Sequence, residues 1–228
     1  MVTTDGNWKD NMAALKNLIF DFDGTIADTS KLIVATWQKV VEEYGLPYRN
    51  EESIKATIGV RLEEIPSILW PELTGLGETL GALYRKNFEK LKDKIPVELF
   101  PEVKETLGTL KEFGCRMAIA TSRSHKSVEE LSGQLGIRNY FSFIVGGDDV
   151  SKGKPSPESI NKILLNMYWE IEESMMIGDM VVDIKMGKNA GIKTCGVTYG
   201  NGKKTELEEA GADFIIPHFS DLTDMVNL

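Results

Sequence analysis

The stretch Leu18-Ile19-Phe20-Asp21-Phe22-Asp23-Gly24-Thr25 decides the fold of this chain. An apolar run typical of a buried strand ends in two carboxylates, and a glycine follows at once. Side chains alternate along a strand, so Asp21 and Asp23 are predicted on the same side if the strand geometry continues. Open α/β sheets bind ligands at the carboxyl ends of their strands. Two carboxylates this close favour a hard, oxygen-liganded cation such as Mg²⁺.

Two other interpretations of this motif use the same residue types. An acidic turn after a strand contains Asp and Gly for conformational reasons alone. A calcium-binding EF-hand loop needs an acidic or amide residue at its fifth position and glycine at its sixth, where this chain has Thr25 and Ile26. The EF-hand is therefore excluded, and the choice between a turn and a catalytic motif depends on the rest of the chain.

Length and composition limit the class of protein. The chain has 228 residues, enough for one large or two small domains, and its 42% hydrophobic and 27% charged residues are typical of a globular protein. A nucleic-acid-binding protein is expected to have a basic face, and none is evident in this sequence of net charge -9. A bound cation can still attract a phosphorylated small molecule to an acidic protein. No apolar run is long enough for a membrane helix, and residues 1–16 lack the apolar core of a signal peptide. We therefore predict a cytoplasmic protein with no membrane or nucleic-acid partner. The sequence carries no signal for a particular oligomeric state.

The first third of the chain is predicted to be helical after its opening strand. Glycine, proline and apolar spacing predict helices over residues 30–44, 51–57, 61–69 and 78–92. No strand pattern is evident between residues 27 and 96. We therefore expect residues 1–28 and 97–228 to form a core domain, and residues 29–96 to form an all-helical insertion over the strand ends. Its connections, residues 27–29 and 96–100, are predicted hinges.

Helix and strand patterns alternate through the remainder of the chain. Helices are predicted over residues 103–113, 127–135, 157–167 and 183–190 and in a segment ending at 207–210, and strands over 116–120, 141–145, 174–177, 193–197 and 213–216. Repeated units of this length indicate a doubly wound parallel sheet of the α/β class.

Polar residues follow four of the predicted strands. They are Asp21 and Asp23, then Thr121-Ser122-Arg123, then Lys154-Pro155 in the loop after the third strand, and finally Gly178-Asp179 with Asp183. The ends of parallel strands converge on one crevice. Acids, a hydroxyl and an ammonium suit a metal-bound phosphoryl group that a carboxylate attacks.

These four segments resemble the four signature motifs of the haloacid dehalogenase-like (HAD) hydrolase superfamily. The resemblance extends from the first strand to the last, and the helical insertion is similar to the small helical cap of the phosphoglycolate-phosphatase-like branch. The tail from Val197 to Gly200 and from Glu209 to Asp213 also resembles that branch. The resemblance implies a Rossmann-like core with a helical cap, a bound Mg²⁺ and a small phosphorylated metabolite as substrate.

The resemblance also implies a role for each motif residue. Asp21 attacks phosphorus and forms an aspartyl-phosphate, while Asp23 protonates the leaving oxygen and then activates water. A carboxylate needs no deprotonation at pH 7 to act as a nucleophile, whereas the proton donor benefits from a raised pKa. Thr121 and the Ser122 backbone are expected to bind the phosphoryl oxygens, and Lys154 to hold both the phosphate and Asp21.

The metal ligands follow from the same resemblance. Asp179 binds Mg²⁺ together with Asp21 and the backbone carbonyl of Asp23, and Asp183 orients this shell directly or through water. Arg61, in the insertion, is a candidate for gripping an anionic leaving group, although a surface arginine would look the same.

Structural roles alone could also explain four of these residues. Thr121 could be a helix N-cap and Lys154 a solvated loop lysine. Asp179 could be a turn residue, and Asp183 an acid that favours the start of a helix.

Several functions remain open on this scaffold. A Mg²⁺-dependent phosphatase acting on a small phosphate monoester is the first, with phosphoglycolate, sugar phosphates, nucleoside monophosphates and inorganic pyrophosphate as substrates. A phosphomutase usually carries a histidine in the first cap helix, where this chain has Ile33. A phosphonate hydrolase uses a cap lysine, for which only the poorly spaced Lys55 is available. A non-catalytic protein often loses one of the motif acids, and a dehalogenase needs no acid such as Asp23.

Two further features bear on the prediction. The branch commonly has glycine after Pro101, where this chain has Glu102, so motion at the second hinge is less well supported than the chemistry. The glycine-rich stretch from Gly196 to Thr205 contains Gly202-Lys203, but a phosphate-binding P-loop needs glycine where Val197 stands.

Overall fold

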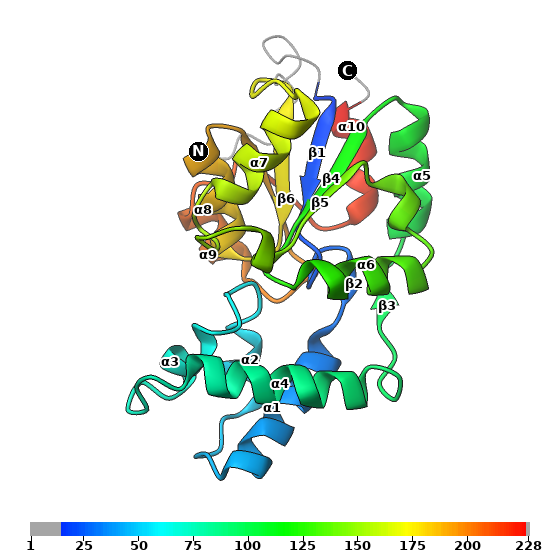
Figure 1. Cartoon of the computed structure of the whole chain (residues 1–228). Helices are drawn as coiled ribbons and strands as arrows, with labels where there is room; N and C mark the ends of the chain where they lie inside the picture. The colour runs from blue at the N-terminus through cyan, green and yellow to red at the C-terminus, as the bar shows by residue number, and fades with distance from the viewer. Residues whose placement is uncertain (1–14, 227–228) are drawn as a thin grey trace.

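A parallel six-stranded sheet forms the centre of the computed structural model, which describes residues 15–226. The strand order is β5-β4-β1-β6-β7-β8 (Figure 1). The strands are β1 (Asn17–Phe20), β4 (Arg116–Ala120), β5 (Phe143–Val145), β6 (Ser174–Gly178), β7 (Lys193–Val197) and β8 (Phe214–Ile216). β1 pairs with both β4 and β6, so the opening motif lies at the middle of the sheet. The predicted doubly wound α/β fold is confirmed.

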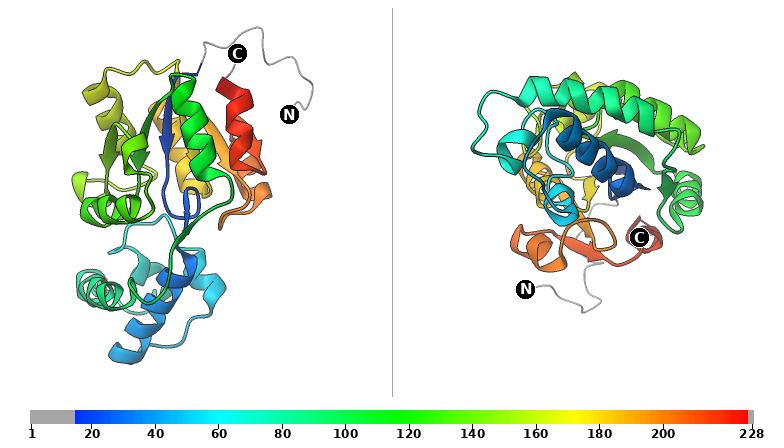
Figure 2. Two further views of the ribbon diagram at one scale, coloured as in Figure 1. Left: turned by 90° about the vertical axis from the view of Figure 1, so that its right-hand side faces the viewer. Right: turned by 90° about the horizontal axis from the view of Figure 1, so that it is seen from below.

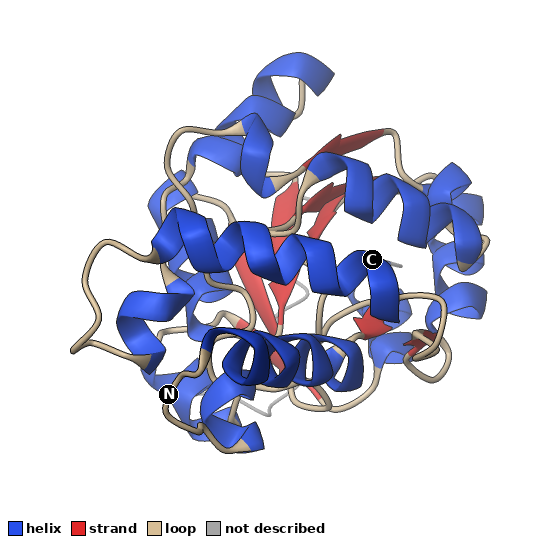
Figure 3. Cartoon of the chain, turned by 60° about the horizontal axis from the view of Figure 1, so that its bottom comes forward, coloured by secondary structure: helices blue, strands red, loops and turns tan. Residues whose placement is uncertain are grey.

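Alternate residues of each strand enter two separate cores, one on each face of the sheet. Leu18 and Phe20 pack on one face with Leu107 of helix α5 (Val103–Glu112), and Ile19 packs on the other face with Ile160 of helix α7 (Glu158–Met167). Helices lie on both faces (Figure 3). They are α5 (Val103–Glu112), α6 (His125–Gln134), α7 (Glu158–Met167), α8 (Val181–Ala190), α9 (Lys204–Glu209) and α10 (Leu222–Val226). A strand buried on both faces reads as a continuous apolar run, which is the pattern of β1.

Four helices between residues 30 and 91 build a third apolar cluster of their own. They are α1 (Ser30–Tyr44), α2 (Glu51–Lys55), α3 (Ile65–Leu69) and α4 (Gly77–Leu91). Trp37, Trp70 and Leu80 are fully buried in this cluster. The four helices, which we call the helical insertion, lie beyond the ends of the sheet strands (Figure 2). The third helix is shorter than predicted, because residues 62–64 form a turn and Pro66 favours a helix start at Ile65.

Both connections to the helical insertion contain a short strand that the sequence did not reveal. β2 (Ala27–Asp28) and β3 (Glu98–Leu99) pair in antiparallel orientation, Ala27 with Leu99 and Asp28 with Glu98 (Figure 1). The expectation that no strand falls between residues 27 and 96 is therefore wrong for Ala27 and Asp28. Two-residue strands carry no periodicity, so no pattern could predict them.

Several short elements also differ from the prediction. α10 and the 3₁₀ turns at residues 138–140, 147–149 and 219–221 were not predicted. The first 14 residues lie outside the described part of the chain. In the described part, no helix has the length and apolar character needed to cross a membrane.

Glu102 adopts a backbone conformation that explains why glycine is common at its place. Its φ is 64°, in the left-handed region, directly before α5. Residues with a Cβ reach this region at a cost of about 1–2 kcal/mol. The Glu102 side chain accepts a hydrogen bond of 2.9 Å from the Ser220 hydroxyl, which offsets part of that cost.

We expect Glu102→Gly to be more stable than Glu102→Ala by about 1 kcal/mol. Both substitutions remove the hydrogen bond to Ser220, but only glycine relieves the backbone. Urea unfolding of the two variants measures the difference. An alanine variant as stable as the glycine variant would contradict the assigned strain.

Candidate active site

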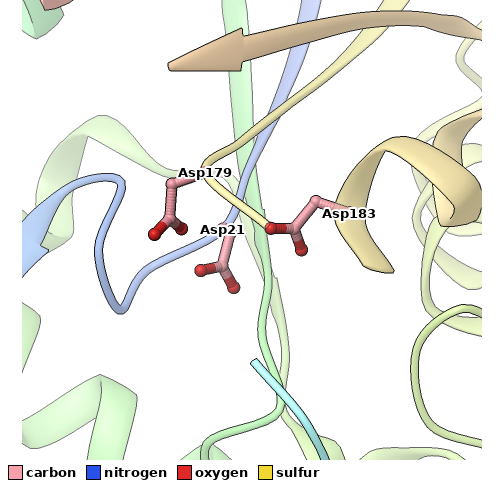
Figure 4. A group of neighbouring side chains, drawn as sticks. All are labelled: Asp21, Asp179 and Asp183. Atoms are coloured by element: carbon pink, nitrogen blue, oxygen red, sulfur yellow. The ribbon is translucent and has the colours of Figure 1, made fainter. Parts of the chain in front are cut away.

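Three buried carboxylates meet where β1 and β6 end. Asp21 follows β1, Asp179 follows β6 and Asp183 lies in the first turn of α8. One oxygen from each carboxylate lies within 4.8 Å of the other two (Figure 4). All three side chains are at most 1% exposed. We call these residues the carboxylate cluster.

Lys154 places its ammonium group inside this cluster. Its Nζ donates to Asp183 Oδ1 at 2.7 Å and also to Asp21 Oδ1. Burial alone lowers the pKa of Lys154, but the carboxylates of Asp183 and Asp21 outweigh this and raise it. Lys154 is therefore a buried cation, and the alternative of a solvated loop lysine is wrong.

Asp179 is held by groups that come from two distant loops. Its Oδ1 accepts from the Thr25 hydroxyl at 3.1 Å, and its Oδ2 accepts from the Asn201 backbone N–H at 2.7 Å. A Cβ on Gly200 would lie 2.5 Å from Asp179 Oδ2, and one on Gly24 would lie 2.3 Å from it. The glycine-rich stretch after β7 is thus no P-loop but the loop that packs against Asp179. Sequence reasoning missed Asn201, for which these glycines were the available signal.

The electrostatics of the cluster call for more positive charge. Burial, together with the charge of Asp183, raises the pKa of Asp179 to about 7. Burial also raises the pKa of Asp21 well above its ordinary range, although Lys154 opposes this. With all three carboxylates ionised, one ammonium leaves two negative charges uncompensated.

A divalent cation fits this arrangement. Asp21 Oδ2 is a buried oxygen that has no hydrogen-bond partner among the described residues. Carboxylate oxygens are the ligands that hard divalent cations prefer, and Asp21, Asp179 and Asp183 supply them together. The carboxylate cluster could therefore hold a metal ion.

Asp23 does not join this cluster, because β1 already ends at Phe20 and the strand geometry does not continue to Asp23. Its Oδ1 accepts from the Thr29 hydroxyl at 2.6 Å, and its Oδ2 accepts from Arg123 Nε at 3.1 Å. Asp23 is 7% exposed and lines a cavity, whereas Asp21 is 1% exposed. The two carboxylates of the opening motif thus have separate environments.

Arg123 is a site residue whose role the sequence did not reveal. Its guanidinium donates hydrogen bonds to the Asp23 carboxylate and, at 3.0 Å, to Ser127 Oγ. The guanidinium carbon also lies 5.1 Å from the ring centre of Phe88 in α4. Burial opposes the charge of Arg123, but Asp23 raises the pKa of the guanidinium above its ordinary value. Arg123 is the third residue of the segment after β4, and this position was the only available signal.

Thr121 and Ser122 follow β4 as predicted, and both have local partners. Thr121 is 3% exposed, and its Oγ1 accepts from the Arg123 backbone N–H at 3.2 Å. The N-cap position of α6 belongs to Ser124, so Thr121 is not the cap. The Ser122 hydroxyl donates to the Gly59 carbonyl of the helical insertion at 2.6 Å.

Arg61 lies at the same contact between the helical insertion and the core. Its Nη1 donates to the Ser151 carbonyl at 2.9 Å, and its Nε lies 3.6 Å from Glu63 Oε2. Its side chain is 30% exposed. Arg61 is therefore neither a solvated surface arginine nor a free guanidinium.

A cavity of about 690 Å³ separates the helical insertion from the core. Asp23, Ser122 and Arg123 line it from the core, while Trp37 and Tyr84 belong to its insertion side. Viewed from the side of the helical insertion, α1 and α4 lie across the ends of the strands (Figure 3). The cavity therefore places a molecule bound under the helical insertion beside Asp23.

Comparisons with known proteins match this architecture. The model of the haloacid dehalogenase-like hydrolase family matches residues 18–197. Pyrophosphatase PpaX of Halalkalibacterium halodurans is 33% identical over 94% of this chain and 98% of its own length. A phosphoglycolate phosphatase of Vibrio parahaemolyticus is 31% identical over 93% of this chain and 96% of its own.

A solved structure is also similar to this chain. A protein from Bacteroides fragilis, described as haloacid dehalogenase-like, superposes with a TM-score of 0.83 at 31% identity, covering 91% of this chain and 99% of the other. The matched residues include all four strand-end segments. The chain therefore belongs to the haloacid dehalogenase-like hydrolase family, in its phosphoglycolate-phosphatase-like branch of phosphatases.

Proposed function

We propose that this chain is a Mg²⁺-dependent phosphatase that hydrolyses a small phosphate monoester through an aspartyl-phosphate on Asp21. The observation that supports this best is the buried carboxylate cluster with Lys154 at its centre. An anionic cluster lacking compensating charge is unfavourable as a purely structural feature. It is useful where a cation and a phosphoryl group bind together.

Asp21 is the proposed nucleophile. One of its oxygens is held by Lys154, and the other, Oδ2, has no partner among the described residues. A carboxylate oxygen attacks phosphorus, the bond to the leaving oxygen breaks, and the phosphoryl group moves to Asp21. Water then attacks the phosphorus of the aspartyl-phosphate and releases inorganic phosphate and free Asp21.

Asp23 is the proposed acid and base of these two steps. It lines the cavity under the helical insertion, where the leaving group must lie. Its carboxyl gives a proton to the leaving oxygen in the first step and takes one from water in the second. Thr29 and Arg123 fix the position of this carboxyl.

Asp21, Asp179 and the backbone carbonyl of Asp23 are the proposed Mg²⁺ ligands, with Asp183 orienting this shell. A bound Mg²⁺ neutralises the charge that accumulates on the phosphoryl oxygens. Thr121, the Ser122 backbone and Lys154 are proposed to bind those oxygens. The tight environment of Asp179, formed by Thr25 and Asn201, keeps its carboxylate in place.

We also propose that residues 29–96 act as a cap domain on a core of residues 1–28 and 97–228. Asp21 is almost completely buried, so a substrate reaches it only when the contacts of Ser122 with Gly59 and of Arg61 with Ser151 open. The β2–β3 pair joins the two connections, which makes them move together. The two paired strands lie within the proposed hinge segments, residues 27–29 and 96–100.

A phosphomutase is a weaker candidate. Ile33 of α1 is 8% exposed and lines the cavity, so the place where a mutase usually has a histidine offers no proton-transferring group. Pyrophosphate and phosphoglycolate are the substrates named for the two curated relatives. Both compounds are therefore reference substrates against which the preference of this chain can be measured.

Asp21→Asn is expected to abolish Mg²⁺-dependent release of phosphate from an aryl phosphate, because the amide cannot attack phosphorus. Phosphate release with and without Mg²⁺ measures this. The matched control is Asp93→Asn, at an exposed position in the turn after α4, which should retain wild-type activity. Activity that survives in Asp21→Asn would disprove the assigned nucleophile.

Asp23→Asn and Arg123→Met are expected to show the same dependence on the leaving group. Loss of the acid in Asp23→Asn should lower kcat/KM about 10²–10⁴-fold with phenyl phosphate. The decrease should be far smaller with 2,4-dinitrophenyl phosphate, whose leaving group needs no proton. Arg123 positions Asp23, so its loss should follow this pattern with a smaller effect of about tenfold. Steady-state kcat/KM with the two esters gives the comparison. Equal losses on both esters would indicate that Arg123 has a structural role only.

Asp179→Asn is expected to stabilise the metal-free protein at pH 8 by about 1–3 kcal/mol. The pKa of Asp179 is raised from 3.8 to about 7 in the folded protein. Between these values the folded state binds more protons than the unfolded state, so stability falls as pH rises from about 4 to about 7. The variant should lose this component of the pH dependence.

Thermal unfolding with EDTA or with Mg²⁺ tests this at several pH values. Mg²⁺ should raise the melting temperature of the wild-type protein more at pH 8 than at pH 5.5, because protons compete for the carboxylates. Asp179→Asn should lose most of the Mg²⁺ effect. An equal Mg²⁺ response in the variant would refute the assigned ligand.

A further inference from the structure

The cavity under the helical insertion has cationic side chains, and each of them is already paired. Among the described residues, Arg61 and Arg85 both contact Glu63, at 3.6 Å for Arg61. Arg123 is paired with Asp23, and Lys126 lies 3.7 Å from Glu130. An anionic leaving group would have to break one of these pairs to gain a cationic partner.

Further carboxylates that line the same cavity also disfavour an anionic leaving group. Glu64 and Glu78 line its rim and form no salt bridge with the described residues. A carboxylate or second phosphate on the substrate would face them without compensation. Like charges in one cavity disfavour binding, so the cavity discriminates against an anionic leaving group.

The opposite wall is aromatic. The rings of Trp37 and Tyr84 lie 5.0 Å apart, and Tyr84 stacks with Phe88 at 6.2 Å. All three residues line the cavity. Trp37 is fully buried behind Tyr84, so this wall is apolar.

The size of the cavity favours a ring-sized leaving group. Its volume of about 690 Å³ lies within the range of about 300–1,000 Å³ that is typical of pockets for drug-sized ligands. Glycolate or a single phosphate group would leave most of the aromatic wall uncovered. A ring-sized alcohol would cover it.

We propose that the substrate is a phosphate monoester whose leaving group is an uncharged, ring-sized alcohol. This inference rests on the proposed phosphatase function, and it excludes phosphoglycolate and pyrophosphate as preferred substrates. Glu63 is then a specificity-determining residue, because it neutralises the two arginines of the helical insertion that could otherwise bind an anion.

Two aryl phosphates that differ in one substituent test the proposal. One is 4-(hydroxymethyl)phenyl phosphate, and the other is 4-carboxyphenyl phosphate. With saturating Mg²⁺, the wild-type protein should have at least about a tenfold higher kcat/KM for the hydroxymethyl ester. Phosphoglycolate and pyrophosphate should be poorer substrates than this ester. A preference for the carboxylate would overturn the proposal.

Glu63→Gln should reverse part of this selectivity. The substitution frees Arg61 and Arg85, so the ratio of the two kcat/KM values should shift toward the carboxylate by at least about fivefold. A ratio cancels any general loss of activity in the variant. Glu72→Gln, whose partner Arg49 does not line the cavity, is the matched control and should leave the ratio unchanged. An unchanged ratio in Glu63→Gln would also overturn the proposal.

Binding separates this inference from the proposed function. Calorimetric titration of both esters into Asp21→Asn with Mg²⁺ should give at least about tenfold tighter binding of the hydroxymethyl ester. If the wild-type protein hydrolyses neither ester, the phosphatase proposal fails while the binding ratio still tests the cavity. Equal affinities would overturn the inference even where hydrolysis is observed.

Discussion

The ion pairs of Lys154 with Asp21 and Asp183 are the interaction on which the site depends. They join the end of β1, the loop after β5 and the start of α8 at one buried point. Side chains that are at most 2% exposed must find all their partners inside the protein. The loops that meet here are therefore held in position by charge, and the glycines of the loop after β7 permit the close approach that Asp179 requires.

The same cluster combines function with a cost in stability. Burial raises the pKa of Asp179 to about 7, so its ionised form is unfavourable in the metal-free protein. A bound divalent cation reverses the sign of this effect. A cation held by these carboxylates would balance their charge and would link folding, metal binding and pH in one group of residues.

The two carboxylates of the opening motif occupy different environments. Asp21 faces the carboxylate cluster, while Asp23 turns to Thr29 and Arg123 beside the cavity. Residues two apart in sequence thus have separate environments, which supports the separate roles proposed for them. The helical insertion completes the arrangement, because Phe88 of α4 covers Arg123 and the Gly59 carbonyl accepts from Ser122.

The sequence by itself determined the α/β fold, the family, and which strand ends carry Asp21, Lys154, Asp179 and Asp183. Long apolar periods and motifs at strand ends are local signals, so they can be read without coordinates. Only the tertiary structure decided the β2–β3 pair, the bonds of Arg123 and Asn201, and the pairing of the cavity arginines with Glu63. Those features depend on contacts between residues distant in the chain, and a two-residue strand or a single side chain leaves no periodic pattern.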